Sequence, residues 1–287
     1  MKTHLIACVI ACASQGHVLS ATVSAPSTQW TPLVGNYDHL VDQQTGIPDG
    51  DIVGQGTDYG FLVTYNSAGP GGSPVPTFGF RLRLDAPGGN ANDIRFNRAA
   101  WLGIDADLNG SIDVFLGVDM SGSANLLGIY SPGTGANTSP STTSISSTAY
   151  LNYTIGNENY NYRPVDYLTD GGTSNDLTPG KKDDDPDYYV SVLVPFEDVV
   201  EFLGGKNITI NESSPLRYVS ATATQNNSLN QDLGGVQGGV NSTTTWTELG
   251  GFSPIMTATG TAIPEPKTEW LGALGFLLLL RRRRAAA

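Results

Sequence analysis

The sequence predicts an all-β protein whose body is a single β-sandwich with one short helix. Runs that alternate apolar and polar residues recur at short intervals, and only one stretch has the helical period. Glycine (35 residues) and proline (17) are abundant, as expected where many turns join short strands. The 287 residues suffice for one large β domain, and no shift in composition marks a boundary inside the body.

The first 25 residues are expected to form a secretory signal peptide. Lys2 supplies a positive charge, residues 5–13 an apolar stretch, and residues 23–25 a small-residue cleavage site, with Ala21 as a rival site. Both cysteines of the chain leave with this segment. The remaining body, residues 26–262, therefore has no thiol to form a disulfide, although its expected destination is oxidising.

Seven runs of the body are expected to form strands, because each has the alternation of a pleated strand. They are residues 61–66, 77–85, 99–105, 111–119, 124–131, 187–195 and 216–224. In the run 77–85, phenylalanine and leucine share one face, whereas Arg81 and Arg83 share the other. We therefore expect this strand to be half-buried, with its arginine face in water.

The single expected helix spans residues 196–205 and ends at two glycines. Two long loops are expected: residues 132–147 are rich in Ser, Thr, Gly and Pro, and residues 169–187 are rich in aspartate. The aspartates at 183–187 are candidates for a second cation site, but a solvated charge run is the favoured interpretation.

The charge of the body limits its partners. Between residues 26 and 266 the sequence has 26 acidic and nine basic side chains, a formal charge of −17. Such a surface repels phosphate backbones and anionic lipids, and it attracts divalent cations. Nucleic acid is therefore not expected as a partner.

The chain ends with three features in order: a Pro-Glu-Pro triplet, an apolar run and a cluster of arginines. They are Pro264, Glu265 and Pro266, residues 270–280, and Arg281, Arg282, Arg283 and Arg284. As a helix the apolar run would be about 16 Å long at about 1.5 Å per residue, short of the roughly 30 Å core of a bilayer. The arginines would stay on the cytoplasmic side and leave the body outside the inner membrane.

This tail, residues 263–287, resembles the PEP-CTERM sorting signal of Gram-negative bacteria. The resemblance implies that the tail forms a transmembrane helix in the inner membrane for a time and is then cut by an exosortase. It also implies delivery to the cell surface or to the exopolysaccharide of the extracellular matrix. A plain C-terminal membrane anchor is the alternative.

The body is also similar to exported surface proteins of the PEP-CTERM class. The matching stretches are DIVGQGTDYGFLVTY, FGFRLRLD, GIDADLNGSIDVFLGVD and RYVSATATQNNSLNQDLGG. The resemblance implies a sandwich of the DOMON or carbohydrate-binding-module kind. It does not specify a ligand, because such sandwiches host many functions.

The stretch DADLNGSID is the one constellation with metal chemistry. Its candidate ligands are the side chains of Asp105, Asp107, Asn109 and Asp113 and the backbone carbonyl of Ser111. Calcium takes six to eight oxygen ligands, which alternate residues of a tight loop can supply. The stretch resembles the D-x-D-x-[DN]-G-x-x-D calcium loops that lie between β-strands; it is not an EF-hand, because no acid stands at the twelfth position.

The same stretch permits a plainer interpretation. Asn109-Gly110 between alternating apolar residues is the strongest short-range signal for a β-hairpin, and the aspartates would then be solvated turn residues. The two interpretations are compatible, since a hairpin can carry an ion. A calcium-binding hairpin is the favoured prediction.

No catalytic motif is present in the sequence. It lacks H-E-x-x-H, P-loop and G-x-S-x-G motifs, and its body lacks cysteine. We therefore expect a non-catalytic, calcium-stabilised protein of the cell surface or matrix, with polysaccharide binding as the favoured activity. Aromatic rings that stack on sugars are candidates for this activity, although most rings in a sandwich belong to the core. They are Trp101, Tyr160, Tyr162 and Tyr167.

Two alternatives to this function remain open. A secreted carbohydrate-active enzyme needs only two carboxylates about 5 to 10 Å apart, and the body is rich in acids. A purely structural adhesion or matrix component would self-associate without selectivity for any saccharide.

Overall fold

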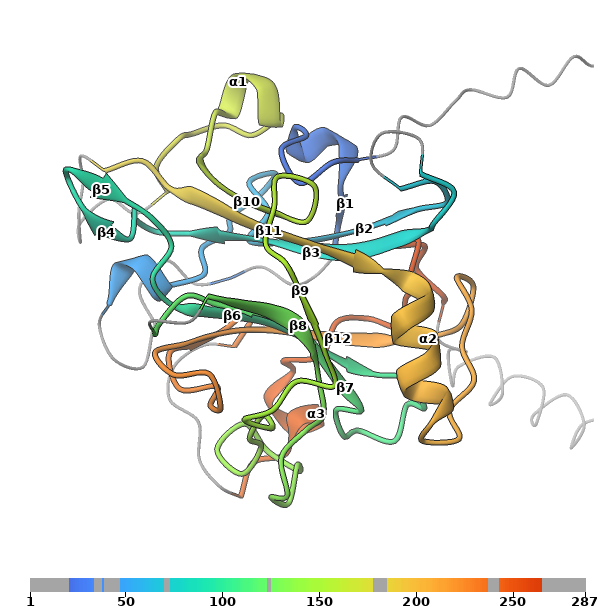
Figure 1. Ribbon diagram of the computed structural model, residues 1–287. Coiled ribbons are helices and arrows are strands. Elements are labelled where there is room, and N and C mark those ends of the chain that lie inside the picture. Colours follow the sequence, from blue (N-terminus) through green and yellow to red (C-terminus); the bar gives the residue numbers. More distant parts are fainter. Residues whose placement is uncertain are drawn as a thin grey trace, which may run out of the picture.

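The computed structural model of the protein describes residues 21–33, 38, 47–69, 73–122, 125–177, 185–236 and 243–264. Two antiparallel sheets stack face to face, and a short separate hairpin lies beside them. Figure 1 shows the two layers from the side, with the first sheet above the second. The predicted all-β sandwich is confirmed.

The first sheet has the strand order β1-β2-β3-β11-β10. Its strands are β1 (Thr31–Pro32), β2 (Phe61–Asn66), β3 (Thr77–Leu84), β10 (Tyr160–Pro164) and β11 (Tyr188–Pro195). The second sheet has the order β13-β12-β6-β7-β8-β9. Its strands are β6 (Ala99–Asp105), β7 (Val114–Asp119), β8 (Leu126–Tyr130), β9 (Leu151–Tyr153), β12 (Arg217–Ala223) and β13 (Asp232–Leu233). The separate hairpin pairs β4 (Gly89–Asn90) with β5 (Asp93–Ile94).

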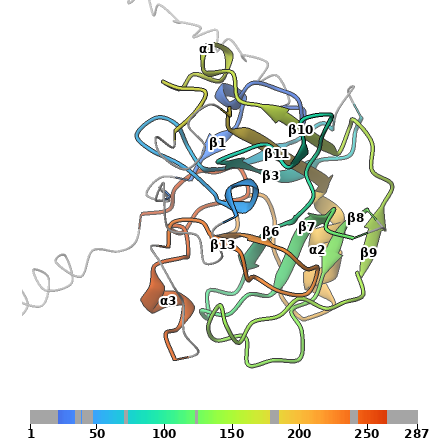
Figure 2. The same cartoon turned by 90° about the vertical axis from the view of Figure 1, so that its left-hand side faces the viewer.

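Helix α2 (Phe196–Gly204) forms where the sequence predicts a helix, directly after β11. Its apolar side chains, among them Val199 and Leu203, are buried in the core between the sheets. Two single-turn helices, α1 (Tyr167–Asp170) and α3 (Trp246–Leu249), and two 3₁₀ turns, Ser27–Gln29 and Pro48–Gly50, are also present. Figure 2 shows α1 and α3 on opposite sides of the sandwich. Elements this short give no periodic signal in the sequence.

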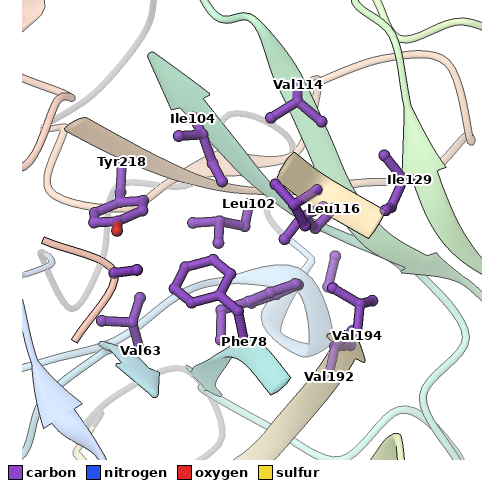
Figure 3. Close-up of a cluster of buried hydrophobic side chains, with 14 of the residues drawn as sticks. Val63, Phe78, Leu102, Ile104, Val114, Leu116, Ile129, Val192, Val194 and Tyr218 are labelled. Carbon is purple, nitrogen blue, oxygen red and sulfur yellow. The ribbon is translucent and has the colours of Figure 1, made fainter. Parts of the chain in front are cut away.

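The main core lies between the two sheets. Figure 3 shows side chains of the first sheet, such as Val63 and Phe78, facing Leu102 and Leu116 of the second. The rings of Phe78 and Tyr218 stack with centroids 5.9 Å apart. Each fully buried side chain of this kind contributes about 1.5–3 kcal/mol relative to an exposed one, so this layer is the main source of stability.

The outer faces of both sheets are covered as well. On the second sheet, Trp101 and Phe115 form a cluster with Trp246 of α3. On the first sheet, the segment 21–33 and Val165 cover Leu62 and other outward side chains. The expectation that the strand 77–85 has one wet face is therefore wrong, because every residue of β3 is buried.

Both arginines of β3 are buried, and Arg83 forms ion pairs with two buried aspartates. The Nη1 and Nε atoms of Arg83 lie 2.8 Å from Asp58 and 2.6 Å from Asp187, and its Nη2 donates to the carbonyl of Ser174. Burial acts to raise the pKa of Asp58, but hydrogen bonds from Thr173 and Arg83 outweigh it and hold that pKa below its usual value. Asp187, expected in a solvated charge run, is thus a buried partner of Arg83.

Strand boundaries depart from prediction in the loop between β6 and β7. The expected strand 111–119 begins only at Val114, because residues 111–113 belong to the loop. Strand β10 was not predicted, since the alternation of tyrosine with polar residues in its sequence, YNYRP, spans only four positions before a proline.

Candidate metal centre

The candidate metal centre is the loop that joins two neighbouring strands of the second sheet. Strand β6 ends at Asp105, β7 begins at Val114, and the last paired residues are Ile104 and Val114. The backbone nitrogen of Asp113 donates to the carbonyl of Ile104 at 2.8 Å, which holds the two ends of the loop together. A hairpin is therefore present, as the Asn-Gly signal predicts, but its loop is longer than a two-residue turn.

The loop wraps around the carboxylate of Asp105. This side chain is fully buried and accepts hydrogen bonds from the backbone nitrogens of Asn109 (3.1 Å) and Gly110 (3.0 Å). The chain makes this turn with two residues in the left-handed region, Leu108 at φ 62° and Gly110 at φ 86°. Glycine adopts that region without strain, which explains its place at the sixth position of the loop.

The loop brings three carboxylates together. One oxygen from each of Asp105, Asp107 and Asp113 lies within 4.8 Å of the others. Asp113 also accepts from the backbone nitrogen of Ala106 at 2.7 Å, which fixes its carboxylate at the base of the loop. Asp105 is buried, Asp113 is half-buried and Asp107 is exposed, so the cluster is open to solvent on the side of Asp107.

The two remaining predicted ligands, the side chain of Asn109 and the carbonyl of Ser111, lie in the loop, and the side chain of Asn109 is engaged with its neighbours. The side-chain oxygen of Asn109 accepts from the backbone nitrogen of Ser111 at 2.8 Å, and its amide nitrogen donates to Asp107 at 2.9 Å. The backbone nitrogen of Asp107 donates to Asp113 at 3.4 Å, so all five candidates are linked by hydrogen bonds inside the loop. A cation bound at this site would replace the amide of Asn109 as a partner of the Asp107 carboxylate.

The proximity of the acids is electrostatically unfavourable. Burial raises the pKa of Asp105 to about 6, and the negative charges of Asp113 and Asp107 add to this rise, although the backbone donors oppose it. Burial also raises the pKa of Asp113. Such shifts show that a negative charge here lacks full compensation, which a bound cation would provide.

Lys206 brings a positive charge to the edge of the loop. Its Nζ donates to the backbone carbonyl of Asp113 at 2.6 Å. Burial lowers the pKa of Lys206, and Asp113 opposes that shift. The positive charge of Lys206 therefore offsets part of the negative charge of the loop. Because its hydrogen bond goes to a backbone carbonyl, the three carboxylates still face one another.

The other predicted residues fall outside this centre. Pro264 is exposed, whereas Glu265, Pro266 and the four arginines of the tail lie outside the described residues, as do 183 and 184 of the acidic loop. Among the residues that are described, no helix has the length and apolarity needed to span a membrane. Of the aromatic candidates, Trp101 is fully buried and belongs to a core cluster. Tyr160 and Tyr162 are partly buried and pack against the main core, and Tyr167 is exposed.

A polar hollow lies at one end of the second sheet, and no pattern in the sequence predicts it. It has a volume of about 790 Å³ and lies where the chain enters β6 and leaves β7, and its lining includes Arg95, Asn97, Arg98, Asn125 and Tyr160. These residues come from separate parts of the chain, so no local motif announces the hollow. The sequence indicates Tyr160 only as a candidate ring for stacking on sugars.

Comparisons with known proteins give no family or relative for this chain. It matches no protein-family model, no curated protein and no solved structure.

Proposed function

We propose that this chain is an exported, non-catalytic surface or matrix protein whose β-sandwich binds calcium in the β6–β7 loop. The observation that carries the calcium site is the convergence of three carboxylates, one of them fully buried, within 4.8 Å. Oxygen donors are the ligands that calcium prefers, and backbone carbonyls and water can complete the six to eight that it needs. The strongly acidic chain, with a formal charge of −12, also favours a cation.

The export part of the proposal rests on the two ends of the sequence. The N-terminal segment has the features of a signal peptide, and the tail resembles a sorting signal that an exosortase processes. Both features agree on an exported body, held at the inner membrane until the tail is cut and then released to the surface. A cation site accords with this destination, because extracellular calcium sites operate at dissociation constants of about 10⁻⁴–10⁻³ M.

Polysaccharide binding is the molecular activity that we propose for the exported body. Its support is the hollow beside Tyr160, where a half-buried ring lies near arginine and amide groups. Rings of this kind stack on sugars, and arginine and amide donors hydrogen-bond to hydroxyl and carboxylate groups. Binding of neutral and acidic polysaccharides in the presence of calcium is the assay for this activity.

The calcium site is tested by calorimetric titration of the purified body with calcium. We expect one site in the parent, and an affinity at least about tenfold lower in Asp107→Ala, because even partners outside the ligand shell cost that much when removed. Asp107 is exposed, so the variant should keep the fold. The matched control is Asp93→Ala, which removes an exposed aspartate of the β4–β5 hairpin. Equal calcium affinity in all three proteins contradicts the site.

A further inference from the structure

The segment that precedes the first 3₁₀ turn is built into the sandwich. The backbone nitrogen of Ala21 donates to the side-chain oxygen of Asn66 at 2.9 Å, and the amide of Asn66 donates back to the carbonyl of Ala21 at 2.8 Å. Asn66 ends strand β2 and is itself buried. A pair of reciprocal hydrogen bonds thus attaches residue 21 to the edge of the first sheet.

Two residues further along, the segment supplies an acceptor for a buried cation. The guanidinium of Arg81 donates to the carbonyl of Val23 at 2.9 Å, and to the hydroxyls of Ser27 at 3.0 Å and Ser191 at 2.8 Å. All three acceptors are neutral oxygens. Because Arg81 is fully buried, the loss of any one of them would leave part of a desolvated charge without a hydrogen bond.

The segment also covers apolar surface. Val23 is fully shielded from water and Ala25 nearly so, and both belong to the cluster that includes Leu62 and Leu193 on the outer face of the first sheet. A turn closes where the backbone nitrogen of Ala25 donates to the carbonyl of Thr22 at 3.0 Å. Residues 21–25 therefore behave as part of the folded body, with a defined path and buried side chains.

Cleavage after Ala25 would remove this cover. It would take away the Val23 carbonyl from Arg81 and both bonds between Ala21 and Asn66. Cleavage after Ala21 would still break the bonds at Asn66. The 3₁₀ turn that follows would stay in place, because the backbone nitrogen of Ser27 is held by Asp170 at 2.8 Å.

We propose that the leader is cut no later than the bond between Ser20 and Ala21, and that residues 21–25 remain in the mature protein as the cover of Arg81. The sequence Val18-Leu19-Ser20 ends in a small residue, as a leader peptidase requires, and is the nearest such site before the folded segment. Hydrolysis there adds one water across the peptide bond and leaves a carboxylate on Ser20 and an α-amino group on Ala21. The boundary after Ala25, which the sequence alone favours, is thereby revised.

This inference rests on the export part of the proposed function and is independent of the calcium site. The direct test is to produce the full chain in a Gram-negative host and to determine the mass and first residues of the exported protein. We expect Ala21 as the first residue. A protein that begins at Thr22 or at Pro26 overturns the inference while leaving export intact. A full-length precursor retained inside the cell contradicts export itself.

A second test compares two recombinant bodies, one beginning at Ala21 and one at Pro26. We expect the shorter protein to melt about 5–10 °C lower, since it loses hydrogen bonds to a charged group and a buried valine. Arg81→Met, made in both proteins, is the matched control. It removes the buried charge, so the difference in melting temperature between the protein that begins at Ala21 and the one that begins at Pro26 should become smaller. Equal melting temperatures of the two unsubstituted proteins would overturn the inference.

Discussion

At the residue scale, Asp105 is a buried carboxylate held by neutral donors. Its side chain is shielded from water, and its two partners in the loop are backbone nitrogens of Asn109 and Gly110. These donors fix the carboxylate but bring no positive charge. Burial, and after it the nearby acids, raise the pKa of Asp105 and so oppose its ionisation in the metal-free protein.

This environment predicts a pH dependence of calcium binding. The pKa of Asp105, raised to about 6 by burial and by the neighbouring acids, lies above the value of about 4 for an unfolded aspartate. In the metal-free protein, the stability that its proton contributes is therefore lost as pH rises from about 4 to about 6. Calcium needs the ionised form, so we expect an apparent affinity about tenfold lower at pH 5 than at pH 7.

Calorimetric titration at the two pH values measures this effect. Repeating the titration in buffers of different ionisation enthalpy reports the proton that calcium displaces near pH 6. The same affinity at pH 5 and pH 7, with no proton released, would contradict a ligand role for Asp105 with a raised pKa.

Arg81 and Arg83 show where reasoning from the sequence fails at this scale. Alternation in the run 77–85 correctly assigns them to the face opposite the phenylalanines. The alternation does not indicate that this face is covered, because the residues that contact the arginines are distant in the sequence. Val23 accepts a hydrogen bond from Arg81, and Asp187 pairs with Arg83. Burial of a charge depends on such long-range pairing, which local periodicity does not encode.

At the element scale, the stretch DADLNGSID forms a hairpin between β6 and β7 and also brings three aspartates together, so both features expected from it are present. The Asn-Gly signal predicts the hairpin correctly, whereas the start of β7 at Val114 shows that acids at positions 105 to 113 shape a longer loop. Side-chain bonds to the backbone replace strand pairing between residues 106 and 113. The position of the three carboxylates was predictable from their spacing; the burial of Asp105 was not, because it depends on packing around the end of β6.

Gly110 is the position where this loop is most sensitive to substitution. Its φ of 86° strains any other L residue, and an added Cβ would lie 3.3 Å from the hydroxyl of Thr247 in α3. We expect Gly110→Ala to lower the free energy of unfolding by about 1 kcal/mol or more and to weaken calcium binding.

The matched control for Gly110 is Gly204→Ala at the end of α2. An added Cβ there meets nothing within 4 Å, and alanine favours a helix, so stability should be unchanged or slightly higher. Urea denaturation of both variants, with calcium and with chelator, measures the difference. Equal effects of the two substitutions would contradict the geometry assigned to the loop.

Strand prediction at this scale succeeded where a strand is long and apolar. Strands β3, β6 and β11 lie within about one residue of their expected bounds, because each is buried along its whole length or nearly so. Strand β10 was missed because it is a short edge strand: its two tyrosines alternate with polar residues and pack against the core, but the pattern spans only four positions before a proline.

At the scale of the whole molecule, the sandwich has buried side chains on both faces of both sheets. Three clusters, one between the sheets and one on each outer face, account for this burial. The sequence predicts the inner layer from its short apolar strands, but the outer layers are made by loops and by the segment 21–33, which have no strand or helix period. The fold class was therefore predictable, and the covering of its surfaces was not.

For the whole molecule, we expect calcium bound at the β6–β7 hairpin to stabilise the folded body. A ligand that binds only the folded state raises its stability by about 2.7 kcal/mol when present at 100 times its dissociation constant. For a domain of this size that gain corresponds to a rise in melting temperature of about 5–10 °C.

The most direct measurement is the thermal melt of residues 21–263 with excess calcium and with excess chelator, beside Asp107→Ala and Asp93→Ala. We expect a rise of about 5–10 °C with calcium for the parent and for Asp93→Ala, and at most about half that rise for Asp107→Ala, whose affinity is at least about tenfold lower. A parent protein that melts at the same temperature in calcium and in chelator would contradict this expectation, and the three carboxylates of the β6–β7 loop would then be an acidic turn without an ion.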